Sequence, residues 1–510
     1  MRKNIVIGLD GANWNLIEPW IKKGELPNLK CLRENGCWGV SISQLPAVTC
    51  PNWKCYSTGK NPAKLGVFWW ERVDREKKKL VGYDSRSFKS LEIFDYISKE
   101  RLKVGVVNMP TTYPPKRLNG FMIAGPPDSA YNGYTFPKSL EQDLKRKYNY
   151  RVYPKVHISS REDIEKYFDE ILSIIDLRFK VARDLLKDVD FLHMSIFYIN
   201  VLHHFFYNEE PVRQAWKLID RNIGEFLQGN HNIILMSDHG TDEVDTSFYI
   251  NSWLEKEGYL KVNRSYLRNL YKIGINKQNL VKLTNRLGLT SLIKRIFSEK
   301  IKRSIPSQDG TMSGTRILES QIDWDKTKVL AAGQGTIYLL VSERSNEYEK
   351  LRNELIEKLR KLTSKNRRKV ARNVYRKEEI YSGKYLDIAP DIVYEEGKHV
   401  YTSSGLGKES YFDTSNKWKA ENNREGIFLA YGHDIKKGKK LDDIKIVDIA
   451  PTILHIMGVP IPKDMDGRVL KEIFEDDSEL AIREVTYQEI DDEKERITRK
   501  IKELKMLKNI

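Results

Sequence analysis

Cysteine and long apolar runs are both scarce in this chain of 510 residues. The four cysteines all lie between residues 31 and 55, and their spacings match neither a zinc ribbon nor a redox pair. We therefore expect buried, reduced thiols. No apolar run approaches the ~20 residues of a membrane-spanning helix, which argues against a transmembrane segment. An apolar run begins at residue 4 and leaves no room for a signal peptide, so we expect a cytoplasmic protein.

Acidic residues are the minority among the charged side chains. The chain has 87 Lys and Arg against 71 Asp and Glu, a formal net charge of +16. This excess favours anionic partners such as phosphorylated small molecules, nucleic acid or anionic lipid, although a solvated basic surface gives the same balance. Apolar residues make up 40% of the chain, enough for a large core. The length indicates one large α/β domain with insertions, or two domains.

Short apolar runs alternate with helical patterns through most of the chain. Residues 4–9, 191–198 and 232–237 are typical of buried strands, and residues 164–186 have helical periodicity. This alternation predicts an α/β fold with a central, mostly parallel sheet between helices. Ligands of such sheets lie beyond the carboxyl ends of the strands, so we expect the functional site there.

Residues 261–305 interrupt this alternation. They contain twelve Lys or Arg against one acid, Glu299, with Leu and Ile at helical spacing. Such a helical insertion could cover a substrate, contact an anionic surface, or be an ordinary solvated face. We divide the chain into an N-terminal part of the core, a basic helical cap, a C-terminal part of the core and a C-terminal helix, at residues 1–254, 255–320, 321–475 and 476–510.

Residue types that bind metals stand at the ends of two of the apolar runs. Asp10 follows the first run, and Asp238 and His239 follow the last. If these runs are neighbouring parallel strands, the three side chains reach the same edge of the sheet and could bind one cation. An Asp-Gly pair after a strand is often only a turn. The adjacent Asp238 and His239 are more specific, because a buried strand rarely ends in two such groups.

Thr49, Asn200 and His204 could add to the same site. Thr49 precedes a helix expected from about residue 52, whose N-terminus would favour bound phosphate. A metal-bound threonine hydroxyl is a potential nucleophile. Asn200 and His204 are four residues apart and share one face of an expected helix. Each could instead serve the structure alone, Thr49 as a helix cap and His204 as a core histidine.

The order of these residues resembles the type I phosphodiesterase/nucleotide pyrophosphatase family of the alkaline phosphatase superfamily. Residues 45–66 resemble the segment that carries the family's threonine nucleophile, and the sequences DIAPTIL at 448–454 and MDGR at 465–468 resemble its C-terminal segments. The resemblance extends from residue 1 to about residue 475. It implies an alkaline-phosphatase-like fold with an inserted cap, and a metal-dependent hydrolase of phosphodiester or phosphate-ester bonds with a phosphorylated small molecule as substrate.

The family uses two zinc or manganese ions. In the family's second site an Asp, a His four residues later and a C-terminal His hold the ion; these correspond to Asn200, His204 and Asn422. Amides are poor replacements for carboxylate and imidazole on zinc. An asparagine that binds phosphate in the nucleotide pyrophosphatases corresponds to Trp70. The resemblance assigns four residues to the first ion, with the threonine as nucleophile: Asp10, Thr49, Asp238 and His239.

The weakened second position leaves three interpretations open. The enzyme could use one metal, with a Lys or Arg in place of the second ion. It could recruit a harder metal such as manganese or magnesium, which accepts amide oxygen. Or the chain could be a catalytically degenerate protein that binds a phosphate ligand or acts as a scaffold. His203, His399 or His433 could also replace a missing ligand. We expect one or two divalent ions, with zinc as the first expectation.

Overall fold

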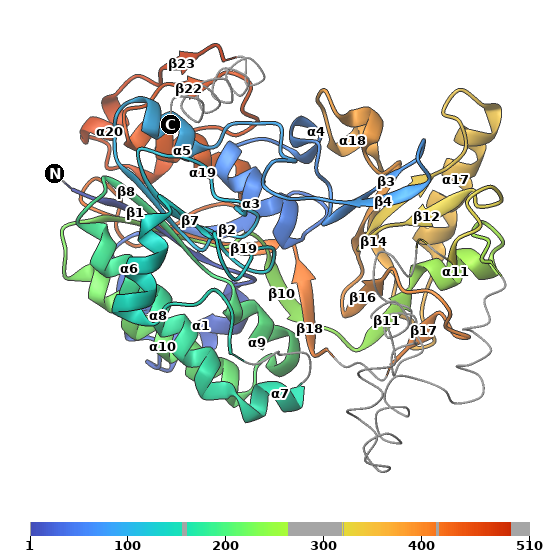
Figure 1. The fold of residues 1–510 in the computed structure, drawn as a ribbon, viewed down its shortest axis with the longest axis horizontal. Coiled ribbons are helices and arrows are strands. Elements are labelled where there is room, and N and C mark those ends of the chain that lie inside the picture. Colours follow the sequence, from blue (N-terminus) through green and yellow to red (C-terminus); the bar gives the residue numbers. More distant parts are fainter. Residues whose placement is uncertain (1, 156–160, 264–318, 320, 415–417, 491–510) are drawn as a thin grey trace.

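A mixed sheet of ten strands forms the centre of the computed structural model, which describes residues 2–155, 161–263, 319, 321–414 and 418–490. Its order is β20–β2–β19–β9–β1–β8–β5–β6–β7, with β21 also paired with β2 (Figure 1). The strands are β1 (Asn4–Leu9), β2 (Cys37–Ile42), β5 (Val104–Val107), β6 (Gly120–Ile123), β7 (Thr135–Phe136), β8 (Phe191–Ile196), β9 (Asn232–Met236), β19 (Glu425–Tyr431), β20 (Lys439–Lys440) and β21 (Ile444–Lys445).

The central strands of this sheet are parallel, as the sequence predicts. β1 lies between β8 and β9 and is parallel to both, so that Gly8 is opposite Ser195 on one side and Met236 on the other. β19 is antiparallel to both β9 and β2, which makes the sheet mixed. β1 and β9 therefore end at the same edge of the sheet.

Helices cover both faces of the sheet and bury its apolar side chains in two hydrophobic clusters (Figure 1). One face is covered by α1 (Trp14–Lys22), α2 (Pro27–Glu34), α6 (Ser139–Tyr148), α7 (Arg161–Lys166), α8 (Phe168–Leu186), α9 (Tyr198–Phe206) and α10 (Glu210–Leu227). The other is covered by α3 (Thr49–Thr58), α5 (Ile93–Lys99) and α19 (Ile449–Ile456). Burial on both faces explains why the central strands are continuous apolar runs.

A second lobe lies beside the main sheet (Figure 1). Its four-stranded sheet has the order β12–β13–β15–β14 and packs in a third hydrophobic cluster with two helices. These elements are β12 (Val329–Ala331), β13 (Thr336–Leu339), β14 (Ala371–Arg376), β15 (Ile392–Glu396), α11 (Ile250–Lys256) and α17 (Asn346–Lys361). A three-stranded sheet adds β11 (Thr246–Tyr249), β16 (Val400–Ser403) and β17 (Phe412–Asp413). An antiparallel ribbon of β10 (Gly240–Glu243) and β18 (Ala420–Asn423) lies between the lobes (Figure 1).

The described strands of residues 321–475 thus contribute to both lobes. The domain boundaries given above stay a prediction. Most of the predicted cap, including the basic pattern from residue 264, lies outside the described residues. Residues 491–510 of the predicted C-terminal helix also lie outside them. Among the described residues, no helix is both long enough and apolar enough to cross a bilayer.

The cysteine thiols are free, and Cys37, Cys50 and Cys55 are buried as expected. Cys31 is exposed, so the expectation of a buried thiol is wrong at this position. It occupies the last turn of α2, whose buried residues are Leu29 and Leu32. The side chain of Cys31 is therefore directed away from the core.

A buried ion-pair network ties α3 to α5. Glu92 accepts hydrogen bonds from Lys54 (2.8 Å) and Ser57 (2.8 Å) on one oxygen and from Lys116 (2.5 Å) on the other. Burial acts to raise the pKa of Glu92, but the charges of Lys116 and Lys54 outweigh it and hold the pKa well below its usual value. The carboxylate is therefore charged throughout the neutral range and compensates Lys54, which is itself buried.

We expect Glu92→Gln to lower the free energy of unfolding by about 3–5 kcal/mol at pH 7, because it leaves the buried Lys54 charge uncompensated. A lowered carboxyl pKa stabilises the fold above the unfolded-state pKa, and this stabilisation is lost as pH falls. The difference from wild type should therefore shrink below about pH 4.5. Urea unfolding at pH 7 and pH 4 measures it, with exposed Glu100→Gln as the control. A difference that does not depend on pH would contradict the prediction.

Candidate metal centre

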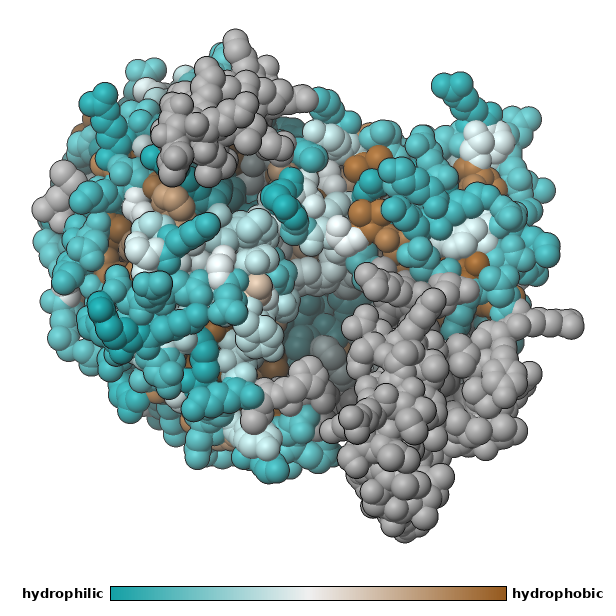
Figure 2. Space-filling view, viewed as in Figure 1, coloured by the Kyte–Doolittle hydropathy of each residue, from teal (hydrophilic) through white to brown (hydrophobic). Residues whose placement is uncertain are grey.

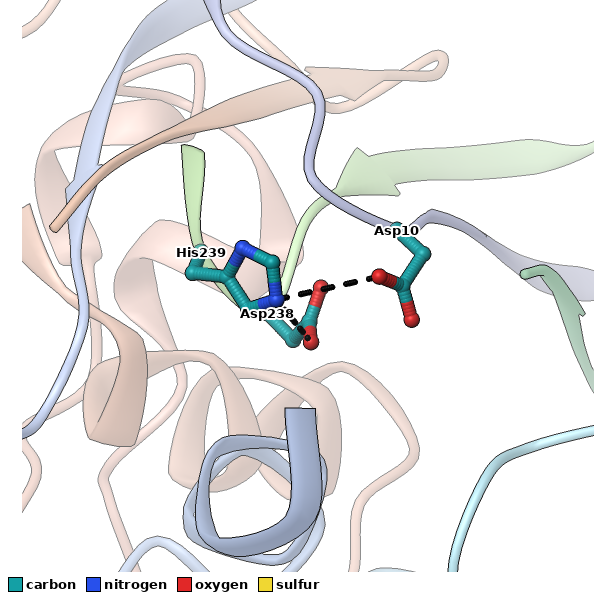
Figure 3. Close-up of side chains that lie close together, drawn as sticks. All are labelled: Asp10, Asp238 and His239. Atoms are coloured by element: carbon teal, nitrogen blue, oxygen red, sulfur yellow. Dashed lines mark ion pairs between the residues drawn. The ribbon is translucent and has the colours of Figure 1, made fainter. Parts of the chain in front are cut away.

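Asp10, Asp238 and His239 converge at the edge where β1 and β9 end (Figure 3). All three side chains are buried, and one ligand atom from each lies within 4.8 Å of the others. The parallel pairing of β1 with β9 brings them together, because the segments that follow the two strands leave the sheet at the same edge. The structure therefore groups the three residues that the sequence predicts as ligands of one cation.

The unused ligand atoms of this group face one another. Nε2 of His239 lies 3.2 Å from Oδ2 of Asp238 and 3.7 Å from Oδ1 of Asp10 (Figure 3). Neither of these two carboxylate oxygens accepts a hydrogen bond from the described residues, although both are buried. Nδ1 of His239 lies 2.8 Å from the carbonyl oxygen of Gly240, so it donates there and leaves the lone pair on Nε2. This donor set fits a divalent metal ion.

Two residues that the sequence analysis did not single out hold the remaining carboxylate oxygens. Nε1 of Trp53 donates to Oδ2 of Asp10 at 3.0 Å, and the backbone N–H of Gly11 donates to Oδ1 of Asp238 at 3.3 Å. Gly11 has a φ of +67°, and a Cβ there would lie 2.3 Å from Oδ1 of Asn200. The Asp-Gly pair after β1 thus provides both a ligand and a tight turn that orients the other carboxylate.

Burial dominates the electrostatics of the group. It raises the pKa of Asp10, and the nearby charge of Asp238 raises it further. Burial likewise raises the pKa of Asp238 to about 8 and lowers the pKa of His239. Two carboxyl groups that share a buried site resist ionising together. A cation among them would reverse both carboxyl shifts, because it stabilises the charged form.

Thr49 lies beside this group. Its Oγ1 is 3.1 Å from Nε2 of His239. The sequence predicts a helix from about residue 52, but α3 already begins at Thr49. The hydroxyl consequently belongs to the first helical turn, where unpaired backbone N–H groups favour a bound anion.

Thr49 is 5% exposed and lines a cavity of about 610 Å³ to which both lobes contribute. Figure 2 shows the surface hollowed between the lobes.

Asn52 fixes the segment that leads into α3. Its Nδ2 donates to the carbonyl oxygens of Pro46 (2.9 Å) and Val48 (3.1 Å), and its Oδ1 accepts from the backbone N–H of Gln44 (2.8 Å). These bonds hold the turn before Thr49 and so position its hydroxyl. The sequence carries no local signal for this role, because the partners are backbone groups of a turn whose path depends on the fold.

The predicted second metal position lies on the wall of the same cavity, which Asn200, His204, Asn422 and Trp70 all line. Asn200 and His204 are one turn apart on α9, as predicted. Oδ1 of Asn200 lies 3.2 Å from the hydroxyl oxygen of Thr241. Nδ1 of His204 lies 2.9 Å from the carbonyl oxygen of Ala420 and donates to it. Asn422 and the other side chains of this wall thus line one cavity, and their role as metal ligands stays a prediction.

The alternative histidines do not line this cavity within the described part of the chain. His203 accepts a hydrogen bond from Trp216 at 3.1 Å and stacks on its ring. His399 donates to the carbonyl oxygen of Glu243, and His433 is exposed beside Asp434. The described lining also contains neither Lys nor Arg. The described residues therefore offer no support for a Lys or Arg in place of the second ion.

Residues 4–423 match the sequence model of the type I phosphodiesterase/nucleotide pyrophosphatase family. The chain belongs to this family. Its members are hydrolases that act on phosphorylated substrates and are typically metal-dependent. Residues 407–502 also match the model of the C-terminal part of N-sulphoglucosamine sulphohydrolase. None of the curated proteins compared with the chain matches it.

Solved structures share the fold of this chain. Murine ectonucleotide pyrophosphatase/phosphodiesterase 5 is 14% identical, with a TM-score of 0.50 over 93% of this chain and 100% of that chain. A mutant of the alkaline phosphatase PafA is 15% identical, with a TM-score of 0.52 over 93% of this chain and 99% of that chain. The predicted family and the alkaline-phosphatase-like fold are confirmed. The roles of the individual site residues remain predictions.

Proposed function

We propose that the protein is a metal-dependent hydrolase of phosphodiester or phosphate-ester bonds, with Thr49 as its nucleophile. The main ion would be held by Asp10, Asp238 and His239. One observation carries the proposal: the hydroxyl of Thr49 lies 3.1 Å from Nε2 of His239, in a group with two buried carboxylate oxygens that lack hydrogen-bond partners among the described residues. A divalent ion such as zinc would satisfy these atoms together.

The residues of the chain would then divide the chemistry as follows. A divalent ion bound in this group would ease the deprotonation of a hydroxyl and withdraw charge from the phosphoryl oxygens. The first turn of α3 would bind a phosphoryl oxygen through its free N–H groups. The Oγ1 of Thr49 would form a bond to phosphorus while the bond to the leaving alcohol breaks and that alcohol gains a proton. Water would then cleave the phosphothreonine and restore the hydroxyl.

The cavity beside Thr49 suits a substrate with an apolar or aromatic group next to its phosphate. The aromatic ring of a substrate packs well against aromatic side chains. Six aromatic residues line the cavity: Trp69, Trp70, Phe197, Phe205, Tyr401 and Trp418. This lining supports small aryl esters as the first substrates to test.

The metal-stripped protein should hydrolyse bis-p-nitrophenyl phosphate or p-nitrophenyl phosphate only after zinc, manganese or magnesium is restored. Release of nitrophenolate measures the rate, and excess chelator should abolish it. A Thr49→Val preparation provides the blank for contaminating phosphatases. If a fully metal-loaded wild type releases nitrophenolate no faster than this blank with either ester, the proposed activity on such esters is wrong.

A non-catalytic role is the second candidate, and Asn200 and Asn422 are the observation that favours it. Amides at two ligand positions would weaken zinc at the second position. A degenerate member of the family could still bind a phosphate ligand or serve as a scaffold. Metal analysis of the purified chain separates the two: two tightly bound ions would exclude the degenerate protein, and failure to bind any ion would favour it.

A further inference from the structure

A buried carboxylate that the family resemblance does not assign stands at the second metal position. Glu421 precedes Asn422 on β18 and is 5% exposed. It lines the same cavity as Thr49, Asn200 and His204. In the sequence, Glu421 is an acidic residue next to a predicted ligand and carries no signal of its own.

The negative charge of Glu421 has little compensation within the described structure. Oε1 accepts one hydrogen bond, from the backbone N–H of Asn422 at 3.1 Å. Oε2 is buried and accepts none from the described residues. Oε1 lies 3.8 Å from Nδ1 of His204, but that nitrogen donates to the carbonyl oxygen of Ala420 at 2.9 Å. Among the described residues, no Lys or Arg forms an ion pair with Glu421.

Neutral donor atoms line the same cavity as this carboxylate. Oδ1 of Asn422 is also buried without a hydrogen-bond partner in the described structure. Oδ1 of Asn200 lies 3.2 Å from the hydroxyl of Thr241, whose single hydrogen has a shorter bond of 2.7 Å to the carbonyl oxygen of Gly11. His204 keeps a lone pair on Nε2, since Nδ1 carries the hydrogen. The wall of the cavity thus offers amide oxygens and an imidazole nitrogen beside one carboxylate.

We propose that Glu421 supplies the second metal position with the carboxylate that Asn200 and Asn422 lack. An isolated buried carboxylate is costly unless a cation compensates it. The donors are mostly oxygen, a ligand set that suits a hard ion such as Mn²⁺. This inference rests on the proposed function in one respect: it assumes that the site has two metal positions. Metal binding tests it separately from catalysis.

The direct test is metal content after equilibrium dialysis of the metal-stripped full chain against graded Mn²⁺. Wild type should bind two ions per chain, the second more weakly. Glu421→Gln should retain the first ion and bind the second on the order of 10–100-fold more weakly. Glu243→Gln is the matched control. Glu243 is exposed on the same ribbon and does not line this cavity. This variant should bind both ions as wild type does.

A rescue variant keeps the test decisive if Glu421→Gln folds poorly. Asn200→Asp places a carboxylate on α9, on the wall of the same cavity. It should therefore tighten the second ion in wild type and restore it in the Glu421→Gln chain. One ion per chain in wild type at saturating Mn²⁺ would overturn the inference, as would unchanged affinity in folded Glu421→Gln. With one ion and Thr49-dependent hydrolysis, only this inference fails. With two ions and no hydrolysis of either ester, only the proposed activity on such esters fails.

Discussion

Thr49→Val is expected to lower kcat/KM for an activated phosphodiester by on the order of 10⁴-fold or more, because loss of a nucleophile removes the covalent step. Valine has nearly the shape of threonine, so the first turn of α3 should keep its packing. The hydroxyl of Thr49 lies 3.1 Å from Nε2 of His239, and valine leaves that neighbour without its oxygen partner. Steady-state hydrolysis of bis-p-nitrophenyl phosphate at saturating metal measures the loss.

Two controls separate chemistry from stability. Thr49→Ser restores a hydroxyl at the same position and should recover much of the activity. Thr58→Val removes a buried hydroxyl from the same helix, one that donates to the carbonyl oxygen of Lys54 at 2.6 Å, and should change the rate little in the folded protein. If folded Thr49→Val retained activity within tenfold of wild type, the threonine could not be the nucleophile.

Asp238→Asn is expected to abolish the tightly bound ion and the thermal stabilisation that the ion provides. At a concentration 100 times its Kd, a ligand of the folded state alone stabilises it by about 2.7 kcal/mol. The variant loses a buried ligand oxygen that has no hydrogen-bond partner among the described residues. Melting temperatures with chelator and with added zinc measure the effect. Asp242→Asn, on the neighbouring β10, is the control and should keep the metal response.

The pH dependence of the metal-free protein gives this prediction a second signature. Burial raises the pKa of Asp238 to about 8 in the folded chain, whereas the unfolded chain releases that proton near pH 4. The folded state therefore binds more protons across this interval, and its stability should fall as pH rises from about 4 to about 8. Asp238→Asn should remove this contribution. Parallel stability profiles for metal-free wild type and variant would contradict the assigned shift.

The raised pKa of Asp238 should also make metal binding depend on pH, with a trend opposite to that of the stability. Because Asp238 must lose its proton to bind, apparent affinity should rise with pH up to about 8. Calorimetric titrations in buffers of different ionisation enthalpy would count the protons released on binding. Their number should decline above pH 8.

Local sequence patterns were sufficient to predict the α/β class and the family. Continuous apolar runs predict β1, β8 and β9 because strands buried on both faces need apolar residues at every position. Polar residues directly after such runs mark the edge where ligands bind. Asp10, Asp238 and His239 were predictable on these grounds, and the structure brings their ligand atoms within 4.8 Å of one another.

The contacts that complete the site could not be predicted in this way. Trp53 reaches Asp10 only because α3 packs beside β1, and Asn52 holds backbone groups of a turn that has no fixed sequence pattern. Glu421 is an ordinary acidic residue in the sequence. Only the fold buries its carboxylate on the same cavity wall as Asn200 and His204.

The sequence by itself determined which chemical groups stand at strand ends, because strand burial and ligand type are properties of a few neighbouring residues. The tertiary structure alone decided which of these groups meet, and which of them remain without a partner. Hydrogen bonds, burial and charge compensation depend on residues hundreds of positions apart, as the contact of Thr49 with His239 illustrates. The ligands of the first metal site could therefore be predicted from the sequence, whereas the unpartnered carboxylate oxygen of Glu421 is evident only in the structure.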